Sequence, residues 1–350
     1  MSGPHVPAAY RNADQANALR WKPGVENCYE IYYLTLNHLR SETGYWIRYT
    51  LHAPQEGLGE AYLEVWFTFF DRQRPESNFG IAQRFPMDRL EALAEPFRLR
   101  IGDNSLENGA CRGVVEGAGH SARWELRFEP CERPFLHFPE SLYASGEVES
   151  AMLSPHFSTR FSGIIEVDGR RLELAGDPGE QSKTWGRQHP PHWLWAHCNH
   201  FAEDPEAAME LVCAPRMSPE EPPSAHILYL KCHGRQFHLM SLLDGSRSEN
   251  DAAPGRWRLR AESMDFRLEA AIECRAADLI EARYTDPNGA PSYCVHTEVA
   301  GAEVRACVRD GESAPWRAFA ILYSRGTTHA EWGDSTPHPE VTKKMTAVSC

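Results

Sequence analysis

One stretch, EQSKTWGRQHPPHWLWAHCNHF (Glu180–Phe201), concentrates side chains that can do chemistry. Its 22 residues hold three of the ten tryptophans and four of the sixteen histidines of the chain. Imidazoles transfer protons near neutral pH and bind metals, whereas indoles form apolar walls that favour nearby cations. The composition of this stretch therefore indicates an acid–base site, a metal site or an unusually aromatic piece of core.

The histidine spacing allows a test of the metal interpretation. His189 and His192 are three residues apart, as are His197 and His200, and paired histidines occur at zinc sites. The Pro-Pro pair between the first two histidines excludes a helix there. On a strand, residues 197 and 200 face opposite sides. We therefore expect no metal ligand set here, and keep a zinc-dependent enzyme as an alternative.

A strand over residues 192–201 places Trp193, Trp195, His197, Asn199 and Phe201 on one face. Ligand pockets are mostly apolar with a few placed polar groups. We expect the aromatic members of this face to bind substrate, with His197 as acid–base group and Asn199 as its partner. The alternative is that the indoles are core and that the two polar side chains satisfy backbone groups.

The residues that precede this strand are candidates for the rim of the same pocket. Gly186 marks a bend or a close approach of the backbone. Trp185, Gln188 and His189 are expected to contact substrate there, with His189 as a third catalytic candidate. Lys183 and Arg187 could also reach the pocket mouth. For any one of the polar residues Lys183, Arg187, Gln188 and His189 alone, a solvated side chain is the favoured interpretation.

Composition limits the class of protein. The chain has 350 residues, a net charge of −13, 42% hydrophobic and 24% charged residues, which is typical of a soluble globular protein. The negative charge argues against binding to nucleic acid or to anionic membranes. We find no secretory signal and no apolar run of about 18 residues, and the cysteines are scattered, so we expect a cytoplasmic protein without a membrane span. The oligomeric state is left open.

Alternating apolar and polar residues, rich in aromatic and β-branched types, recur along the whole chain and predict many short antiparallel strands. VDGRR and CHGRQ each place a glycine between two such runs, which is typical of tight hairpins. The best helical pattern is PMDRLEALAEPF (Pro86–Phe97). The fold class is therefore all-β, with two barrel-like domains. The expected boundaries are an N-terminal extension at 1–25, domains at 26–180 and 181–335, and a tail at 336–350. A long connector at 129–160 and an exposed loop at 214–225 complete the organisation.

Four segments carry a resemblance to a known superfamily. GYWIRYTLHAP (Gly44–Pro54), AYLEVWFTFFDR (Ala61–Arg72), RFSGIIEVDGRRLEL (Arg160–Leu174) and the histidine-rich stretch itself resemble, in order and spacing, the AttH and carotenoid 1,2-hydratase (hydroxyneurosporene synthase) superfamily. That resemblance implies two packed lipocalin-like β-barrels with ligand space inside or between them. It also implies redox-neutral chemistry on hydrophobic polyene or polyketide substrates, as in the related tocopherol cyclase-like proteins and decalin-forming cyclases.

This chain departs from the superfamily pattern at one place. Lys183-Thr184 stands where His-Asn would be expected, which puts any acid–base role of that position in doubt. His189, Trp193, Trp195, His197 and Asn199 match the pattern residue for residue.

We therefore expect a hydratase, cyclase or isomerase without a redox cofactor, acting on a hydrophobic unsaturated small molecule. Trp46, Tyr49 and Trp66, from the first two matching segments, are expected to contribute to substrate binding. The alternative is a non-catalytic carrier of a hydrophobic ligand, since lipocalin-like barrels commonly only bind.

Overall fold

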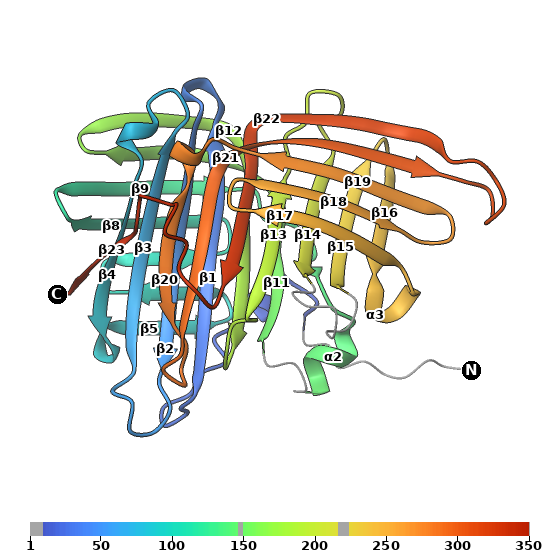
Figure 1. Ribbon diagram of the computed structural model, residues 1–350. Coiled ribbons are helices and arrows are strands. Elements are labelled where there is room, and N and C mark those ends of the chain that lie inside the picture. The colour runs from blue at the N-terminus through green and yellow to red at the C-terminus, as the bar shows by residue number, and fades with distance from the viewer. Residues whose placement is uncertain (1–9, 146–149, 216–223, 350) are drawn as a thin grey trace.

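Two large β-sheets form the computed structural model, which describes residues 10–145, 150–215 and 224–349 (Figure 1). The predicted all-β class is confirmed. The described residues contain short helices alone, α1 (Ala13–Asn17), α2 (Glu140–Ser145) and α3 (Ser241–Asp244), with 3-10 turns at Leu39–Ser41, Pro75–Ser77, Met87–Arg89 and Ala276–Asp278. Within that part of the chain, no helix has the length and apolar character needed to cross a membrane.

The first sheet has 13 strands. Their order is β23 (Thr346–Ser349), β4 (Phe79–Pro86), β3 (Tyr62–Asp71), β2 (Thr43–Ala53), β1 (Cys28–His38), β12 (Arg170–Gly186), β11 (Ser150–Val167), β9 (His120–Phe128), β8 (Ala110–Gly117), β7 (Asn104–Glu107), β6 (Phe97–Ile101) and β5 (Leu90–Ala94), with β10 (Phe135–Leu136) paired to β11. These pairings are antiparallel except that of β23 with β4, which is parallel.

The second sheet has 10 strands and is antiparallel throughout. Their order is β16 (Arg235–Met240), β15 (Ala225–Cys232), β14 (Ala208–Ala214), β13 (His192–Cys198), β22 (Arg317–Asp334), β21 (Pro291–Val308), β19 (Phe266–Glu273), β18 (Arg256–Glu262) and β17 (Arg247–Ala253), with β20 (Ile280–Thr285) paired to β21.

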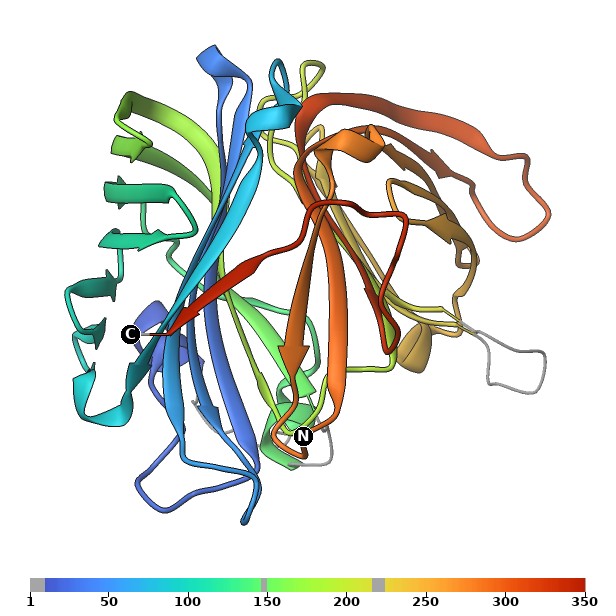
Figure 2. The same cartoon turned by 60° about the vertical axis from the view of Figure 1, so that its left-hand side comes forward.

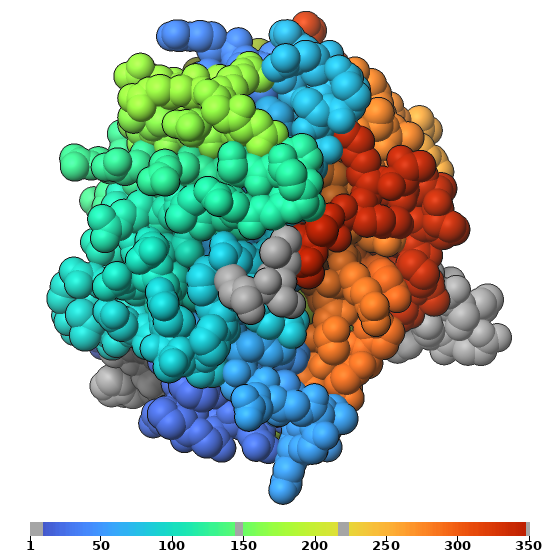
Figure 3. Space-filling model, turned by 90° about the vertical axis from the view of Figure 1, so that its left-hand side faces the viewer, coloured from blue at the N-terminus to red at the C-terminus, as the bar shows by residue number. Residues whose placement is uncertain are grey.

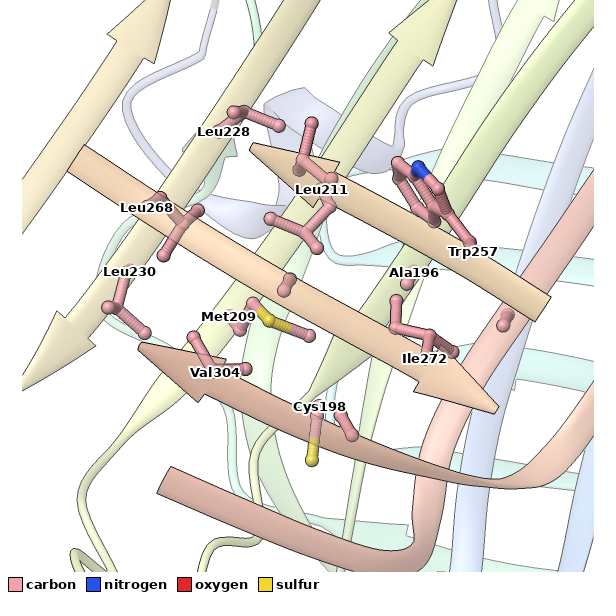
Figure 4. Close-up of a cluster of buried hydrophobic side chains, with 14 of the residues drawn as sticks. Ala196, Cys198, Met209, Leu211, Leu228, Leu230, Trp257, Leu268, Ile272 and Val304 are labelled. Carbon is pink, nitrogen blue, oxygen red and sulfur yellow. The ribbon is translucent and has the colours of Figure 1, made fainter. Parts of the chain in front are cut away.

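Each sheet curls around its own apolar core, and the two sheets stand back to back (Figure 2). The strand order of the first sheet ends at β23 and β5, and that of the second at β16 and β17. The expected lipocalin-like halves are therefore present as strongly curved half-barrels. Figure 4 shows the second core, in which side chains of β13 and β14 meet those of β18 and β19.

Side-chain alternation gives each central strand one face toward its own core and one toward the other sheet. On β1, Tyr32 and Leu34 belong to the first core, whereas Ile31 and Tyr33 belong to a separate apolar cluster. That cluster, which we call the intersheet cluster, also takes Trp195 from β13. The two half-barrels thus bury aromatic side chains between their backs.

The expected domain boundaries differ from the observed sheets at both ends of the second half. β12 stays in the first sheet up to Gly186, six residues past the expected boundary at 180. Residues 346–349, expected as part of a tail, form β23 and pair with β4. Figures 2 and 3 show this red segment running from the second half of the molecule onto the first.

The prediction of a helix at Pro86–Phe97 is wrong. This segment contains the end of β4, a 3-10 turn and β5, and β5 pairs with β6 across the turn at Glu95–Pro96. A run this short between two prolines gains little from helix formation, and β6 offers it unpaired backbone groups at the sheet edge. The edge position also explains why β5 remains mostly exposed.

The predictions of two hairpins, a connector and a loop have mixed outcomes. Both hairpins are confirmed, with two positive-φ residues at each turn, Asp168–Gly169 and His233–Gly234. The expected connector at 129–160 contains β10 and α2, but its last residues already belong to β11. Most of the loop expected at 214–225 lies outside the described residues.

Candidate functional site

Two members of the predicted aromatic face, Trp193 and Trp195, lie on the side of β13 that faces the space between the two sheets. Trp193 and Trp195 alternate along β13 with Leu194 and Ala196, which belong to the second core. The indoles therefore face the backs of β1, β2 and β3, where the intersheet cluster includes Tyr33, Trp46 and Trp66. This location differs from the interior of the second barrel, where a strand face would ordinarily line a lipocalin cavity.

Two cavities lie in this space. The smaller, of about 170 Å³, is mostly apolar and is lined by Ile31, Tyr33, Trp46, Met152, Trp193, Trp195 and Val212 among others. The larger, of about 340 Å³, is more polar and is lined by residues that include Tyr29, Thr50, His52, Glu64, Trp66 and Arg84. Arg48, His189 and Tyr284 line both cavities, so the two are adjoining compartments of one site.

His189 is held at the junction by an acid and by stacked rings. Its Nδ1 lies 2.6 Å from Oδ1 of Asp286, and the backbone N–H of His189 donates to the same oxygen. The imidazole stacks on Tyr29 at 4.7 Å and on Tyr284 at 5.1 Å between ring centroids. A carboxylate at Nδ1 places the proton on that nitrogen and leaves Nε2 as an acceptor. Burial lowers the pKa of His189, which favours this neutral form.

Glu331 is the acid of the apolar compartment. Its strand, β22, pairs with β13, and Oε2 accepts a hydrogen bond of 3.1 Å from Nε1 of Trp193. Burial raises the pKa of this carboxyl, while the bond from Trp193 and the charge of Arg48 oppose that rise. Since Trp193 also stacks on His189 at 5.7 Å, one indole contacts both titratable groups.

His197 and Asn199 lie behind the apolar compartment and line neither cavity. His197 Nε2 donates to the carbonyl of Phe157 at 2.9 Å. Asn199 Nδ2 donates to the carbonyls of Gly179 and Thr159 at 2.9 and 3.3 Å. Both side chains are buried, and their hydrogen bonds connect β13 and the residue that follows it to the first sheet. This is the structural alternative left open by the sequence.

His197 belongs to a cluster of three possible metal ligands. One ligand atom each of Glu180, His197 and Glu210 lies within 4.8 Å of the others, and all three side chains are buried. Nε2 of His197, which lies 4.0 Å from Glu180, carries a proton because it donates to a carbonyl. Glu210 Oε1 accepts from Trp195 Nε1 and lies 2.8 Å from His137 Nε2. We interpret the cluster as a buried hydrogen-bond network.

The remaining predicted residues separate into two groups. Trp46 and Trp66 line the cavities. Four others line neither cavity: the Tyr49 hydroxyl donates to the Ser105 carbonyl in the first core, Phe201 packs in the second core, Trp185 lies under the guanidinium of Arg20, and Gln188 is exposed.

Lys183, the residue at which this chain departs from the superfamily pattern, lies outside the site. Its side chain points away from the cavities, where Nζ lies 3.0 Å from Glu30 Oε2 and donates to the Ala18 carbonyl. Burial lowers the pKa of Lys183 to about 8, against the opposing effect of Glu30. The neighbour Thr184 lines the apolar compartment instead. Lys183 anchors the N-terminal segment and does not contact the site.

The sequence did not predict a place in the site for Arg48, Asp286 or Glu331. Arg48 lies between Trp46 and Thr50 on the same face of β2, so a charged residue on an otherwise buried strand face was its signal. Glu331 carried a similar signal on β22. Asp286 follows β20 in the turn TDPNG, where an aspartate ordinarily serves the turn.

Comparisons with known proteins agree with this fold. Residues 105–327 match the family model described as tocopherol cyclase-like. An uncharacterised protein of Mycobacterium tuberculosis is 22% identical over 316 residues, covering 90% of this chain and 88% of that protein. The chloroplastic tocopherol cyclase of Zea mays is 32% identical over 98 residues, covering 23% of this chain and 18% of the maize protein.

The crystal structure of an AttH-type protein from Nitrosomonas europaea has the same fold. It superposes with a TM-score of 0.52 at 12% identity, over 89% of this chain and 96% of that one. The family match extends over more than half of the sequence and includes β13, β14 and most of β22. The chain belongs to the tocopherol cyclase-like family.

Proposed function

We propose that this protein is a cofactor-independent, redox-neutral enzyme, a hydratase, cyclase or isomerase, which acts on a hydrophobic unsaturated small molecule between its two sheets. The observation that carries the proposal is Glu331, a buried acid on the wall of an apolar, indole-lined compartment. A carboxyl with a raised pKa holds its proton to higher pH than an exposed glutamate does, and this suits it to act as a general acid.

Protonation of a carbon–carbon double bond accounts for all three reaction types. The O–H bond of Glu331 breaks, a C–H bond forms from the π electrons, and a carbocation is left beside the carboxylate. Water adds to that cation in a hydratase, an internal nucleophile closes a ring in a cyclase, and loss of a neighbouring proton completes an isomerisation. The faces of Trp193 and Trp195 favour the cation through their quadrupoles.

In this proposal, His189 takes up the second proton. Asp286 at its Nδ1 fixes the tautomer in which Nε2 is a base. Nε2 therefore accepts a proton from adding water, from a cyclising hydroxyl or from carbon. The cycle closes when His189 releases that proton to solvent and Glu331 takes one up from solvent, so no net proton, oxidant or reductant is consumed.

The name of the maize relative supports a cyclisation of this kind, although the match covers a small part of that protein. The same apolar compartment equally favours the runner-up, a carrier that binds a hydrophobic ligand without converting it. The two proposals differ in one measurable respect, which is the formation of product.

Solvent-hydrogen incorporation tests the proposal. The protein is incubated in deuterated water with a panel of polyenes, isoprenoids and unsaturated polyketides, and products are analysed by mass spectrometry. We expect a product with one non-exchangeable deuterium, lost in Glu331→Gln and retained in the surface control Glu303→Gln. Saturable binding with no product from any panel member would support the carrier instead.

A further inference from the structure

We propose that Arg48 forms an anion subsite of this cavity, so that the substrate is a hydrophobic molecule bearing a carboxylate or enolate group. This inference rests on the proposed function because it names the substrate class of the same site. It is carried by the contacts, burial and position of one side chain on β2.

Arg48 is a buried cation that lacks a counterion. It is 4% exposed, and Nε donates to Thr50 Oγ1 at 2.8 Å. Within residues 10–145, 150–215 and 224–349, no carboxylate forms an ion pair with Arg48. A buried charge without a partner destabilises the folded protein, so we expect a cation that is unpaired in the protein alone to find its partner in the ligand.

Neighbouring cations show that the fold supplies counterions elsewhere. Arg84, in the same polar compartment, pairs with Glu64 at 2.9 Å, and the buried Lys183 pairs with Glu30 at 3.0 Å. Glu64 also accepts a bond from Trp66 Nε1, and Asp286 is engaged by His189. Glu64 and Asp286, two carboxylates at the polar compartment, therefore already have partners in the protein. Arg48 has no carboxylate partner among the described residues, and its guanidinium can bind an anionic group of the ligand.

The surroundings of Arg48 favour a planar anion. The guanidinium carbon lies 4.3 Å from the ring centroid of Tyr284, 4.9 Å from that of Trp66 and 5.5 Å from that of Trp46. These rings offer the guanidinium no hydrogen-bond acceptor in the plane of its N–H groups, and Nε alone is bonded within the described part of the chain, to Thr50. The terminal N–H groups therefore remain for a planar carboxylate or enolate.

The position of Arg48 at the junction defines how such a molecule would lie. Arg48 lines both compartments, with polar groups such as Thr50 and His52 on one side and apolar ones such as Ile31 and Met152 on the other. An acid with an unsaturated hydrocarbon chain matches this arrangement. Its anion meets Arg48, and its chain extends past Trp193 toward Glu331.

A matched pair of ligands tests the subsite independently of turnover. Geranic acid and geraniol share one unsaturated chain and differ in the charged group, and their affinities are measured by isothermal titration calorimetry. We expect the wild-type protein to bind the acid at least about tenfold more tightly, as charged hydrogen bonds commonly provide. Arg48→Met should abolish this preference while it leaves geraniol binding within about threefold, and Arg48→Lys should keep part of it.

Two controls separate competing explanations. Arg283→Met removes a positive charge from an exposed residue on the wall of the polar compartment and should retain the preference. Glu331→Gln tests whether Arg48 serves only as the counterion of that acid, and it should leave the preference equal or larger. Thermal unfolding of each variant establishes that it is folded.

Four outcomes contradict the proposal. Equal affinity of the wild-type protein for both ligands overturns it and leaves the proposed function standing. Persistence of the preference in a folded Arg48→Met, or its loss in Arg283→Met alone, overturns the assignment to Arg48. Failure of the wild-type protein to bind either ligand contradicts the subsite and the proposed hydrophobic cavity together.

Discussion

The indole of Trp193 lies flat against Gly333, its partner residue across the β13–β22 pairing. A Cβ atom at residue 333 would lie 1.9 Å from the indole Cδ2, which no packing allows. The absence of a side chain there lets the indole turn along β22 and donate to Glu331 at 3.1 Å. Gly333 thus determines where the acid of the apolar compartment finds its hydrogen-bond donor.

Gly333→Ala should displace the indole and break its bond to Glu331. Overpacking of this kind typically costs about 1–3 kcal/mol in the free energy of unfolding, measured by urea denaturation. Adding Trp193→Phe should recover part of that loss, because the smaller ring relieves the clash. Additive effects in this double-mutant cycle would show that the contact between the two residues is not the cause.

Glu331 makes the stability of the protein depend on pH in a defined direction. Burial raises the pKa of this carboxyl above its ordinary 4.5, so the unfolded state ionises first as pH rises. The stability due to the neutral group is complete below that ordinary value and is lost as pH rises toward the folded-state pKa. Glu331→Gln, which cannot ionise, should therefore gain stability relative to the wild-type protein as pH rises above 4.5, and the gain should level off once pH passes the folded-state pKa. A stability difference that is constant with pH would refute this assignment.

His189→Gln should lower turnover roughly 100-fold or more, because a general base is removed. Asp286→Asn should lower turnover less and shift the pH profile, since it alters the tautomer while the imidazole remains. The matched control is His192→Gln: His192 pairs with Asp334 at 3.3 Å and lines neither cavity. An equal loss in His192→Gln would point to a structural effect common to this segment.

Asn199→Ala should destabilise the protein by about 2 kcal/mol, because buried carbonyls of the first sheet lose their donor. Ligand affinity of the folded variant should stay close to that of the wild-type protein, since Asn199 lines neither cavity. Urea denaturation and calorimetric titration measure the two effects separately. Asn288→Ala, at an exposed residue, is the control for loss of a surface amide. Selective loss of ligand binding in Asn199→Ala would restore the role in the site that the sequence suggested.

Strand alternation predicted the face of β13 correctly as far as the strand continues. Trp193 and Trp195 share a face that lines a cavity, because the period of two is a local property of extended backbone. β13 ends at Cys198, and after that residue the alternation no longer holds, which is why Phe201 packs in the second core. The depth of the cavity likewise depends on the opposite sheet, so the sequence did not show that His197 lies behind it.

The charged residues of the site depend on contacts between distant parts of the chain. Arg48 and Glu331 are separated by nearly the whole sequence, and each looks like an isolated charge within its own strand. Both line the apolar compartment because the two sheets pack back to back, which local periodicity does not encode. His189 was identified because its own segment is unusual, whereas its partner Asp286 lies in a turn of ordinary composition.

The pairing of β23 with β4 has a consequence for synthesis on the ribosome. Met345 and Ala347, beside and within β23, complete the wall of the polar compartment, and β4 belongs to the first quarter of the chain. Until residues 346–349 have left the exit tunnel, β4 therefore has no strand paired to its outer side. Since open strand edges recruit other chains, this interval is the period in which the nascent protein is most exposed to misassembly, and in which a chaperone that covers β4 would matter most.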